Sequence, residues 1–565
     1  EYKKYAWLAL ICIGVEVVLE IMVPKLMADL IDIGVTNSDV PYIINKGIQM
    51  AVCAVAALIL GVGSARFSAL AGQGLGANIR KAEYEKLQSY SFSNIDHFSV
   101  SSLVTRLTSD VTNIQNAVST GMRPFGRSPV MLIFATTLAF QINSTLALVF
   151  LVALPVLAVL LIIIIINVGP RYGRMQGAVD LVNRCIEENL TAVRVVKSYV
   201  RGDYEIEKFG HVNDNLKNES EKAFGIAVLN MPAMQFVMYS TILGILLIGG
   251  RLINSGQMMI GQLTSFLSYV LLILNSLMMM SNVFLLMTRS LASAERIMKV
   301  IDEPIDITDE NAKDIEVKKG EIEFNHVWFK YKDTAKEYVL SDVSFHINAG
   351  QTVGIIGQTG SSKTTLIQLI PRLYDASKGE IKIDGINVKE YPVRHLRDAI
   401  SVVLQKNTLF SGSLIDNLRW GDENATLDEI KEACSIACVD EFIDRLPRGL
   451  DAEMGQEGVN VSGGQKQRIC IARAILKKPK VLILDDSTSA VDTATEGKIR
   501  NALAKKLPDM TKIIIAQRIS SVRHADQIII MDGGRVDAIG THESLLKTNK
   551  IYQEIYESQK EGADL

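Results

Sequence analysis

The sequence predicts an all-α membrane domain followed by an α/β domain, and three observations support this fold class. The mean hydropathy of +0.21 is high for a soluble chain of 565 residues. Six long apolar stretches lie before residue 300, whereas short β-rich runs alternate with helical runs after residue 320. Charged residues make up 21% of the chain and the formal net charge is -3. Disorder and a nucleic-acid partner are therefore not expected.

The longest apolar stretch runs from Leu146 to Ile166 and is interrupted only by Pro155. A helix of about 20 residues, at about 1.5 Å per residue, crosses the roughly 30 Å hydrocarbon core of a bilayer. With five comparable stretches this predicts six transmembrane helices, near Tyr5–Leu30, Ile48–Ala71, Pro129–Ile142, Leu146–Ile166, Ala223–Gly250 and Leu263–Thr288. The membrane domain is expected over residues 1–300.

Basic residues fall mainly in alternate connections between these spans. The second connection contains Arg80, Lys81, Lys86 and Arg106, and the fourth contains Arg171, Arg174, Arg184, Arg194, Lys197 and Arg201. The first and fifth contain only Lys46 and Arg251. The positive-inside rule then predicts a multi-pass membrane protein whose even connections and termini are cytoplasmic. We expect this membrane to be the plasma membrane. Because the even connections carry helical periodicity, the membrane helices are expected to extend well into the cytoplasm.

Glu16 and Glu20 lie four residues apart in the first span, on one face of the predicted helix. A carboxylate that faces lipid costs at least about 2.5 kcal/mol, so both are expected to face a polar or wet interior. Two interpretations remain open. The pair contacts a cationic substrate or a coupled proton, or neighbouring helices or the membrane interface satisfy it.

The composition changes after Ile301, where the polar run Asp302–Glu310 begins. We assign residues 301–319 to a linker and residues 320–565 to the α/β domain. In this domain Val353–Ile356 is expected to form a buried strand that leads through a loop into a helix. The loop consists of Gly357, Gln358, Thr359, Gly360, Ser361, Ser362, Lys363, Thr364 and Thr365.

This order of strand, loop and helix is the one that a phosphate-binding loop requires. Backbone N–H groups and the helix N-terminus would hold the β- and γ-phosphates of ATP, Lys363 would neutralise their charge, and the Thr364 hydroxyl would ligate Mg²⁺. Ser362 stands where the motif has glycine. A second buried strand, Lys480–Asp485, ends in a carboxylate that suits a magnesium site. The second half is thus predicted to be an α/β P-loop nucleotide-binding domain.

A glycine-rich helix start lies between these two strands. Its residues are Ser462, Gly463, Gly464 and Gln465. The phosphate loop, this tetrapeptide and the strand aspartate, in this order and spacing, resemble the ATP-binding cassette family. With six preceding spans, nearly the whole chain resembles a half-transporter of the exporter type. The resemblance implies that the tetrapeptide caps the γ-phosphate bound to the opposite subunit, so that a complete site needs two cassettes.

The resemblance also implies roles for single residues. Tyr331 matches the aromatic residue that stacks on adenine, and Gln405 matches the glutamine that contacts magnesium and the membrane domain. Ser487–Asp492 matches the loop that communicates across the dimer. The turns near Ser101–Arg106 and Tyr199–Tyr204 would couple the two domains, the second by reaching the other subunit's cassette.

Besides Ser362, two positions of the hydrolytic site depart from the family pattern. Asp486 stands where a glutamate polarises the attacking water, and Gln517 stands where a histidine holds the γ-phosphate. One methylene fewer withdraws the carboxylate by about 1.5 Å, and a misplacement of about 1 Å can cost on the order of 10²-fold in rate. The amide of Gln517 forms hydrogen bonds but carries no proton or imidazolium charge. Weak ATP hydrolysis is expected at this site.

These features resemble one subunit of a bacterial heterodimeric multidrug exporter. The partner is expected to be a second half-transporter with intact catalytic Glu and His and an altered signature opposite Lys363. ATP binding would join the cassettes and favour outward-facing helices, and hydrolysis at the partner's site would reset the inward state. The expected substrate is a small, amphipathic or hydrophobic compound. The alternatives are a slow homodimeric exporter, a lipid or peptide exporter, and an ATP-gated regulator or channel.

Overall fold

A computed structural model describes residues 2–310, 312–332, 334–486 and 491–561. Its contacts divide the chain into two compact units. Unit 1 consists of Glu1–Gln88 and Ser101–Asp302, and unit 2 consists of Ser89–Val100 and Glu303–Leu565. The short segment between the second and third spans therefore belongs to the second unit.

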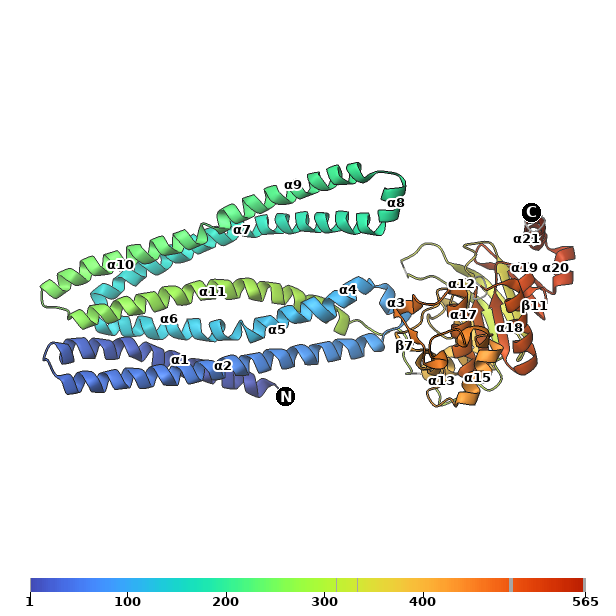
Figure 1. Ribbon diagram of the computed structural model, residues 1–565, viewed down its shortest axis with the longest axis horizontal. Helices are drawn as coiled ribbons and strands as arrows, with labels where there is room; N and C mark the ends of the chain where they lie inside the picture. The colour runs from blue at the N-terminus through green and yellow to red at the C-terminus, as the bar shows by residue number, and fades with distance from the viewer. Residues whose placement is uncertain (1, 311, 333, 487–490, 562–565) are drawn as a thin grey trace. The chain divides into compact units, whose positions relative to one another are not determined.

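Unit 1 is built from long helices that run side by side (Figure 1). The main ones are α1 (Lys3–Asp29), α2 (Val40–Gln88), α6 (Met122–Ile142), α7 (Ser144–Thr191), α10 (Asn230–Asn254) and α11 (Ile260–Ile301). Among the residues that the structure describes, six helical segments are long and apolar enough to cross a membrane: Lys3–Val35, Val40–Gln88, Val100–Ile142, Ser144–Thr191, Gly202–Asn254 and Ile260–Met280. This confirms the six predicted helices.

The membrane helices continue beyond the bilayer as long extensions. At about 1.5 Å per residue, α2 is roughly 74 Å long, more than twice the hydrocarbon thickness. Helices α7 and α9 run side by side and end at the short helix α8 (Figure 1). The remaining segments of unit 1 are η1 (Leu30–Val35), α4 (Val100–Thr105), η2 (Arg106–Asp110), α5 (Val111–Ser119), α8 (Val193–Ser198) and α9 (Gly202–Ala227). The predicted cytoplasmic extensions are confirmed.

The core of unit 1 lies where α1, α6 and α11 meet. Ile13 and Val17 of α1, Ala135 of α6, and Phe266 and Tyr269 of α11 are almost fully buried there. The Tyr269 hydroxyl donates a hydrogen bond to the carbonyl of Ile21 at 2.9 Å, so the phenol is satisfied inside the core. Large apolar side chains on the outer face of α2 are exposed instead, as a surface in contact with lipid requires.

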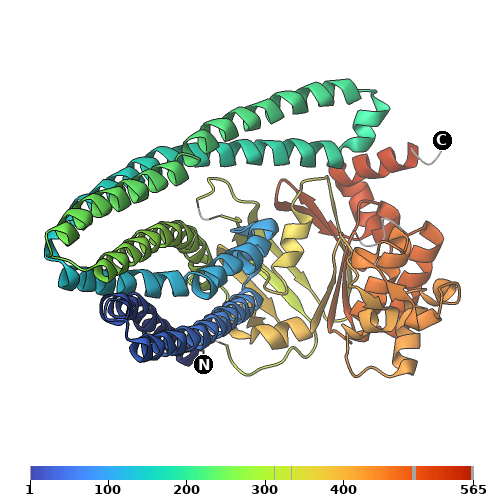
Figure 2. The ribbon, with the colours of Figure 1, turned by 60° about the vertical axis from the view of Figure 1, so that its left-hand side comes forward.

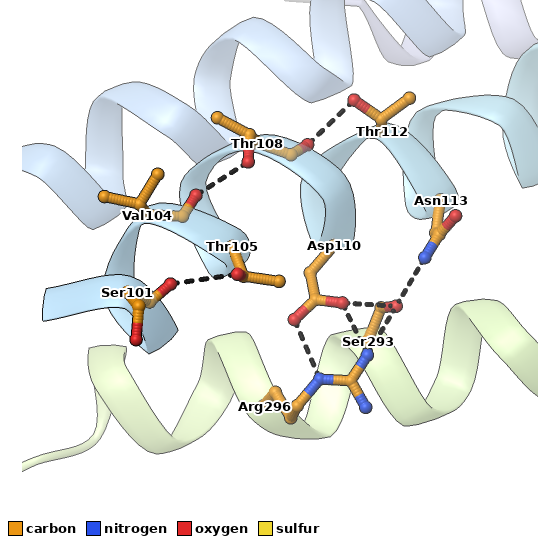
Figure 3. Close-up of polar contacts among 9 residues, drawn as sticks. All are labelled: Ser101, Val104, Thr105, Thr108, Asp110, Thr112, Asn113, Ser293 and Arg296. Atoms are coloured by element: carbon orange, nitrogen blue, oxygen red, sulfur yellow. Dashed lines mark hydrogen bonds and ion pairs between the residues drawn. The ribbon is translucent and has the colours of Figure 1, made fainter. Parts of the chain in front are cut away.

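A polar cluster outside this core connects η2 to α11 (Figure 3). The guanidinium of Arg296 donates to both carboxylate oxygens of Asp110, with Nε at 2.8 Å from Oδ2. Ser293 donates to Asp110 at 2.9 Å and accepts from Asn113 at 3.1 Å. Because Asp110 is buried and its acceptors are occupied, this bidentate pair joins the extension of the third span to that of the sixth.

Unit 2 contains two main sheets. The antiparallel sheet has the order β2 (Leu340–Ile347), β1 (Ile322–Phe329), β4 (Lys378–Ile383), β5 (Ile386–Asn387). The larger sheet has the order β12 (Arg535–Gly540), β11 (Gln527–Asp532), β3 (Thr352–Gly357), β10 (Thr511–Ile515), β9 (Val481–Asp485), β6 (Ile400–Val403). Its strands are parallel except β12. A short pair is formed by β7 (Gly412–Ser413) and β8 (Glu453–Met454).

Helices cover the strands of unit 2, and those between residues 414 and 476 (orange in Figure 2) lie on one side of them. The helices are α3 (Phe92–Asp96), α12 (Lys363–Gln368), η3 (Val388–Glu390), α13 (Val393–Asp398), α14 (Leu414–Arg419), α15 (Leu427–Ile436), α16 (Asp440–Ile443), η4 (Gly449–Asp451), η5 (Gln456–Gly458), α17 (Gly463–Leu476), α18 (Thr493–Lys506), α19 (Ile519–Val522), α20 (His542–Thr548) and α21 (Lys550–Glu561). Together with the sheets they form the predicted α/β domain.

Candidate functional site

The order of the parallel sheet brings three distant loops together. Strand β10 lies between β3 and β9, and all three are parallel. Their carboxyl ends therefore meet at one edge, where ligands of open α/β sheets bind. The phosphate loop follows β3, the aspartate pair follows β9, and Gln517 follows β10. A cavity of about 310 Å³ opens at this edge, lined by residues of all three segments.

The phosphate loop turns sharply between β3 and α12. Gly360 has φ 87° and Ser362 has φ 69°, so both lie in the left-handed region. A Cβ at Gly357 would lie 2.1 Å from the carbonyl oxygen of Met531, so only glycine fits at the start of the loop. A residue other than glycine in the left-handed region costs on the order of 1–3 kcal/mol. The serine at position 362 therefore holds a strained turn that glycine would adopt more easily.

Lys363 closes the loop on itself. Its ammonium group donates to the carbonyls of Gly357 at 2.9 Å and Gln358 at 2.8 Å, and to the Ser361 hydroxyl at 3.2 Å. Burial lowers the pKa of Lys363, and the charges of Asp485 and Asp486 act in the opposite direction. The lysine charge is thus held inside the loop, where a bound phosphate would be its natural counter-ion.

Asp485 and Thr364 face each other across the cavity. The Thr364 hydroxyl donates to Oδ1 of Asp485 at 3.2 Å. Oδ2 of Asp485 is buried and has no hydrogen-bond partner among the described residues. Burial raises the pKa of Asp485, because the charged carboxylate loses its hydration. A hydroxyl and an unsatisfied carboxylate oxygen are ligands that suit Mg²⁺, so these two residues fit the predicted metal site.

The two hydrolytic positions that depart from the family pattern, Asp486 and Gln517, contact each other. Nε2 of Gln517 donates to Oδ2 of Asp486 at 2.8 Å, and Nε2 of Gln405 lies 3.5 Å from the same oxygen. Burial raises the pKa of Asp486, whereas the hydrogen bond from Gln517 acts to lower it. Asp486 has φ 45°. The sequence-predicted pair and Gln405 are therefore brought together at one carboxylate.

Tyr331 lies beside the phosphate-loop helix. Its hydroxyl is 2.9 Å from the hydroxyl of Thr365, and its ring packs edge-on against Phe329 and Tyr374. The ring is partly exposed, which leaves a face for stacking with a planar ligand.

Tyr374 and Asp96 were not found from the sequence. The Tyr374 hydroxyl donates to Oδ2 of Asp96 at 2.7 Å, and the ring of Phe92 lies 6.1 Å from that of Tyr374. Burial raises the pKa of Tyr374. Helix α3 is therefore joined through Tyr374 to the ring of Tyr331. No sequence signal links these residues, because Asp96 and Tyr374 are 278 positions apart.

The signature residues lie away from the phosphate cavity, since none of the four lines it. Ser462 caps α17 in a capping box: it accepts from Gln465 N at 3.3 Å, and its own N–H donates to the Gln465 side chain at 2.9 Å. Ser462 and Gly463 are exposed. Within one chain, the signature and the phosphate loop are therefore separate surfaces. Of Ser487–Asp492, residues 487–490 lie outside the described residues.

In unit 1, Glu16 and Glu20 are paired with arginines of α6. Arg123 and Arg127 donate to Glu16 at 2.7 and 3.2 Å, and Arg127 also donates to Glu20 at 2.6 Å. The second interpretation of the carboxylates, satisfaction by a neighbouring helix, describes these contacts. The arginines were missed because the predicted third span began after them, at Pro129, whereas the helical segment runs from Val100 to Ile142.

Comparison with known families and proteins agrees with this architecture. The family model of the ABC transporter transmembrane region matches residues 6–277, and the ABC transporter model matches residues 340–489. The ABC transporter ATP-binding protein YfiB of Bacillus subtilis is 38% identical over 565 residues, covering 100% of this chain and 98% of that protein.

Relatives with more specific names are also similar. The ATP-dependent lipid A-core flippase of Pseudomonas putida is 33% identical over 525 residues, covering 92% of this chain and 86% of the flippase. The putative multidrug export ATP-binding/permease protein YgaD of Bacillus subtilis is 31% identical over 495 residues, covering 85% of this chain and 83% of YgaD. A solved structure of a bacterial Atm1-family ABC exporter has the same fold, with a TM-score of 0.85 at 22% identity over 98% of this chain and 99% of that one.

Six membrane-spanning helices fused to a P-loop domain define a membrane transporter of the exporter type, in which ATP hydrolysis is coupled to transport. The chain belongs to the ABC transporter family and has the architecture of an exporter half-transporter. It is a multi-pass membrane protein whose nucleotide-binding domain is cytoplasmic.

Proposed function

We propose that this chain is one half of a heterodimeric ATP-driven exporter. Its own site binds ATP and hydrolyses it slowly, and its signature helix completes the faster site on a second half-transporter. The observation that carries this proposal is the contact at Asp486, whose Oδ2 receives the Gln517 amide at 2.8 Å and faces the Gln405 amide at 3.5 Å.

Binding of ATP follows from the cavity beside the phosphate loop. The loop N–H groups and Lys363 bind the β- and γ-phosphates, and Tyr331 stacks on adenine. Thr364 and Asp485 would hold Mg²⁺, and Gln405 lines the same cavity. A metal ion held there would neutralise part of the negative charge of the phosphates. Lys363, Thr364, Asp485 and Tyr331 are all present, which favours nucleotide binding in spite of the serine at position 362.

Hydrolysis is weakened because the general-base position is short and occupied. A base must lie within hydrogen-bond reach of the water that it polarises. Asp486 is one methylene shorter than glutamate, and an amide proton already occupies the oxygen that faces Gln517. Gln517 itself offers no proton for transfer and no positive charge. The short side chain of Asp486 and the uncharged amide of Gln517 both impair activation of the attacking water. Neither change removes a group that binds the nucleotide, so slow hydrolysis is favoured over weak binding.

The partner supplies the rapid site. The exposed start of α17 at Ser462 and Gly463 carries backbone N–H donors in a region of positive helix dipole. Facing the phosphate loop of another cassette, this surface binds the γ-phosphate held there. A chain that keeps this helix start but has a defective base is most useful beside a partner with intact Glu and His.

The second coupling turn supports an arrangement across subunits. Tyr199 and Val200, beside the tip at α8, are 75% and 87% exposed. Unit 2 in turn has a cavity of about 360 Å³ lined in part by Phe410 and Trp420, whose rings stack at 4.1 Å. We propose that this tip binds the corresponding cavity of the partner's cassette. Joining of the cassettes by ATP then moves the helices that end there.

The names of two relatives favour an amphipathic or hydrophobic substrate, since one is a lipid A-core flippase and the other a putative multidrug exporter. A membrane domain with apolar helices gives such compounds direct access from the bilayer. The proposed cycle is alternating access. Two ATP molecules favour the outward-facing state, and hydrolysis at the partner's site restores the inward-facing state.

The test is the ATPase rate of the chain purified alone and reconstituted in lipid. The wild-type chain is expected to show little turnover, whereas the double variant Asp486→Glu, Gln517→His is expected to gain on the order of 10²-fold in kcat. Asp509→Glu, the same change at an exposed position outside the site, should leave the rate unchanged. Rapid hydrolysis by the wild-type chain alone, or no gain in the double variant, contradicts the proposal.

A further inference from the structure

The loop that carries Gln517 is short and joins β10 to α19. The N–H of Ala516 still donates to the carbonyl of Ile355 in β3, at 3.2 Å, and α19 begins at Ile519. Arg518 is the N-cap residue of α19, but its side chain makes no capping hydrogen bond among the described residues. The first N–H groups of a helix have no partner within the helix, so this helix start needs a partner from elsewhere.

Helix α21 contacts this loop through the side chain of Gln559. Its Oε1 accepts from the N–H of Ile519 at 2.9 Å, and its Nε2 donates to the carbonyl of Gln517 at 2.7 Å. These two backbone groups lie on either side of Arg518, so one amide holds the loop at both ends. Glutamine suits this contact because its amide contains both an acceptor and donors. The loop is therefore held between the sheet and α21.

Helix α21 packs on the core of unit 2, and this packing fixes the place of Gln559. Tyr552 of α21 is fully buried. Ile555 and Tyr556 pack against a core cluster that includes Ile519 of α19. Gln559 lies three residues beyond Tyr556 and four beyond Ile555, so it is on the same face of the helix. Helices α19 and α21 are in contact and lie close together in Figure 1.

On its other side, the loop faces the phosphate cavity. Gln517 lines that cavity, and its Nε2 donates to Oδ2 of Asp486 at 2.8 Å. An amide NH₂ group has two N–H donors, so a second one is available to an acceptor on a ligand. Gln517 stands where the family resemblance places a contact with the γ-phosphate, and a phosphate oxygen is a strong acceptor. A nucleoside triphosphate would gain this hydrogen bond, whereas a diphosphate would not.

We propose that Gln559 is a positioning residue for Gln517, and that through this contact α21 sets how strongly the site prefers a nucleoside triphosphate over a diphosphate. The inference rests on the assignment of the site to ATP in the proposed function and adds a residue to it. The carbonyl that Gln559 holds and the side chain of Gln517 are attached to the same Cα atom, so a shift of the backbone moves the amide with it. A displacement of about 1 Å takes a hydrogen bond out of its normal range.

The first test is hydrogen–deuterium exchange of the full chain in dodecyl maltoside, without nucleotide. Gln559→Ala is expected to speed exchange in the peptide that covers residues 516–522, because the N–H of Ile519 loses its acceptor. Gln553→Ala is the matched control, because Gln553 lies on the same helix and donates to the carbonyl of Leu546 in α20 at 2.8 Å. Unchanged exchange in Gln559→Ala overturns the proposal.

The second test is the ratio of the Kd for ADP to the Kd for adenylyl imidodiphosphate, an ATP analogue that is not hydrolysed. Both constants are measured with Mg²⁺, by displacement of a fluorescent ATP analogue from the full chain. Gln517→Ala removes the donor and should lower this ratio about tenfold, because hydrogen bonds to charged groups are strong. Gln559→Ala should lower the ratio about threefold or more, with the Kd for ADP unchanged, and Gln553→Ala should not alter it.

Gln559→Glu is a second variant of nearly the same size. It keeps an acceptor for the N–H of Ile519 but loses the donor to the carbonyl of Gln517, so it should lower the ratio in the same direction. Wild-type ratios in both Gln559 variants overturn the proposal.

Combining two substitutions separates positioning from a general effect on the fold. If Gln559 acts only through Gln517, the variant with both Gln517→Ala and Gln559→Ala should bind like Gln517→Ala alone. Independent losses that multiply, or an unchanged ratio in Gln517→Ala, overturn the proposal. Equal loss of affinity for ADP and for the ATP analogue also overturns it, because a purely structural role has that effect.

These measurements need no hydrolysis, so their failure is distinct from failure of the proposed function. Rapid ATP hydrolysis by the wild-type chain alone contradicts the slow site and the heterodimer, but the role of Gln559 still stands. If the Gln559 variants keep the wild-type ratio while the ATPase results hold, the positioning role is wrong and the exporter proposal remains.

Discussion

The membrane domain and the nucleotide-binding domain both bury charged groups, but they satisfy them differently. In the nucleotide site, Oδ2 of Asp485 has no hydrogen-bond partner among the described residues, and the three acceptors of Lys363 all belong to its own loop. In the membrane cluster, Glu16 and Glu20 are both paired with arginines. The first site depends on a ligand to complete its interactions. In the second, ion pairs between neighbouring helices hold both carboxylates, although Oε2 of Glu20 makes no hydrogen bond among the described residues.

The largest expected effect tests whether the membrane cluster is a structural unit. Glu16→Ala removes the carboxylate that holds both arginines, and breaking a buried pair costs about 3–5 kcal/mol. We expect a clearly lower thermal unfolding midpoint of the full chain in dodecyl maltoside. Glu20→Ala is the control: the Glu20 side chain is 34% exposed and pairs with Arg127 only, so its loss should cost much less. Equal losses contradict the description of Glu16 as the centre of the cluster.

The next prediction concerns the nucleotide site, where the loss is expected in ligand affinity and not in stability of the fold. Lys363→Ala removes a charge whose three acceptors all belong to its own loop, so the fold should be little affected. Affinity for ATP at this site should fall about 10²-fold, because charge-assisted hydrogen bonds contribute about 1.5–3 kcal/mol each. Binding of a fluorescent ATP analogue to the chain measures this, with the exposed Lys505→Ala as control. A large loss of stability with unchanged affinity for ATP would mean that Lys363 serves the fold and not the ligand, contrary to the contrast drawn with the membrane cluster.

A smaller effect is expected at Ser362, where the nucleotide site stores strain. Because φ is 69°, Ser362→Gly removes a steric cost and should stabilise the nucleotide-binding domain by about 1 kcal/mol. Ser361→Gly is the comparison, since position 361 does not have a positive φ. Chemical denaturation followed by tryptophan fluorescence compares the two variants. Stabilisation by both, or by neither, is inconsistent with strain at position 362.

The smallest effect is expected at Tyr374. Tyr374→Phe keeps the ring that packs on Tyr331 but removes the hydrogen bond to Asp96, which contributes about 1 kcal/mol. We expect a few-fold weaker ATP binding if Tyr374 positions Tyr331, and Tyr374→Ala should be worse because the ring is lost as well. The measurement is the Kd for ATP compared with that for GTP. Unchanged affinity in both variants excludes a positioning role.

The elements that carry strong local patterns were predictable from the sequence. The six spans have long apolar runs. The phosphate loop has its glycines and lysine between a strand and a helix, and β9 is an apolar strand that ends in an aspartate. Asp486 and Gln517 were assigned to one hydrolytic site only through the family resemblance; in the structure they meet because both follow the parallel strands β9 and β10. A local pattern was sufficient wherever neighbouring residues along the chain build the feature.

Features made by distant residues were not predictable. Arg123 and Arg127 precede the apolar stretch of their span, so their pairing with α1 depends on how the helices pack. The left-handed backbone at Ser362 is a property of the turn, which residue type alone suggests only weakly. The contact of Asp96 with Tyr374 joins segments that are hundreds of residues apart, and only the fold brings them together.

The membership of Ser89–Val100 in unit 2 limits how the two halves of such transporters can be recombined. Asn94 donates to the carbonyl of Pro304 at 2.8 Å, and His97 lies 2.8 Å from Glu303, in addition to the contact of Asp96. A cassette cut from residue 303 onward would lack this whole patch. Chimaeras that exchange cassettes between relatives should therefore transfer residues 89–100 together with the cassette, so that these contacts are kept.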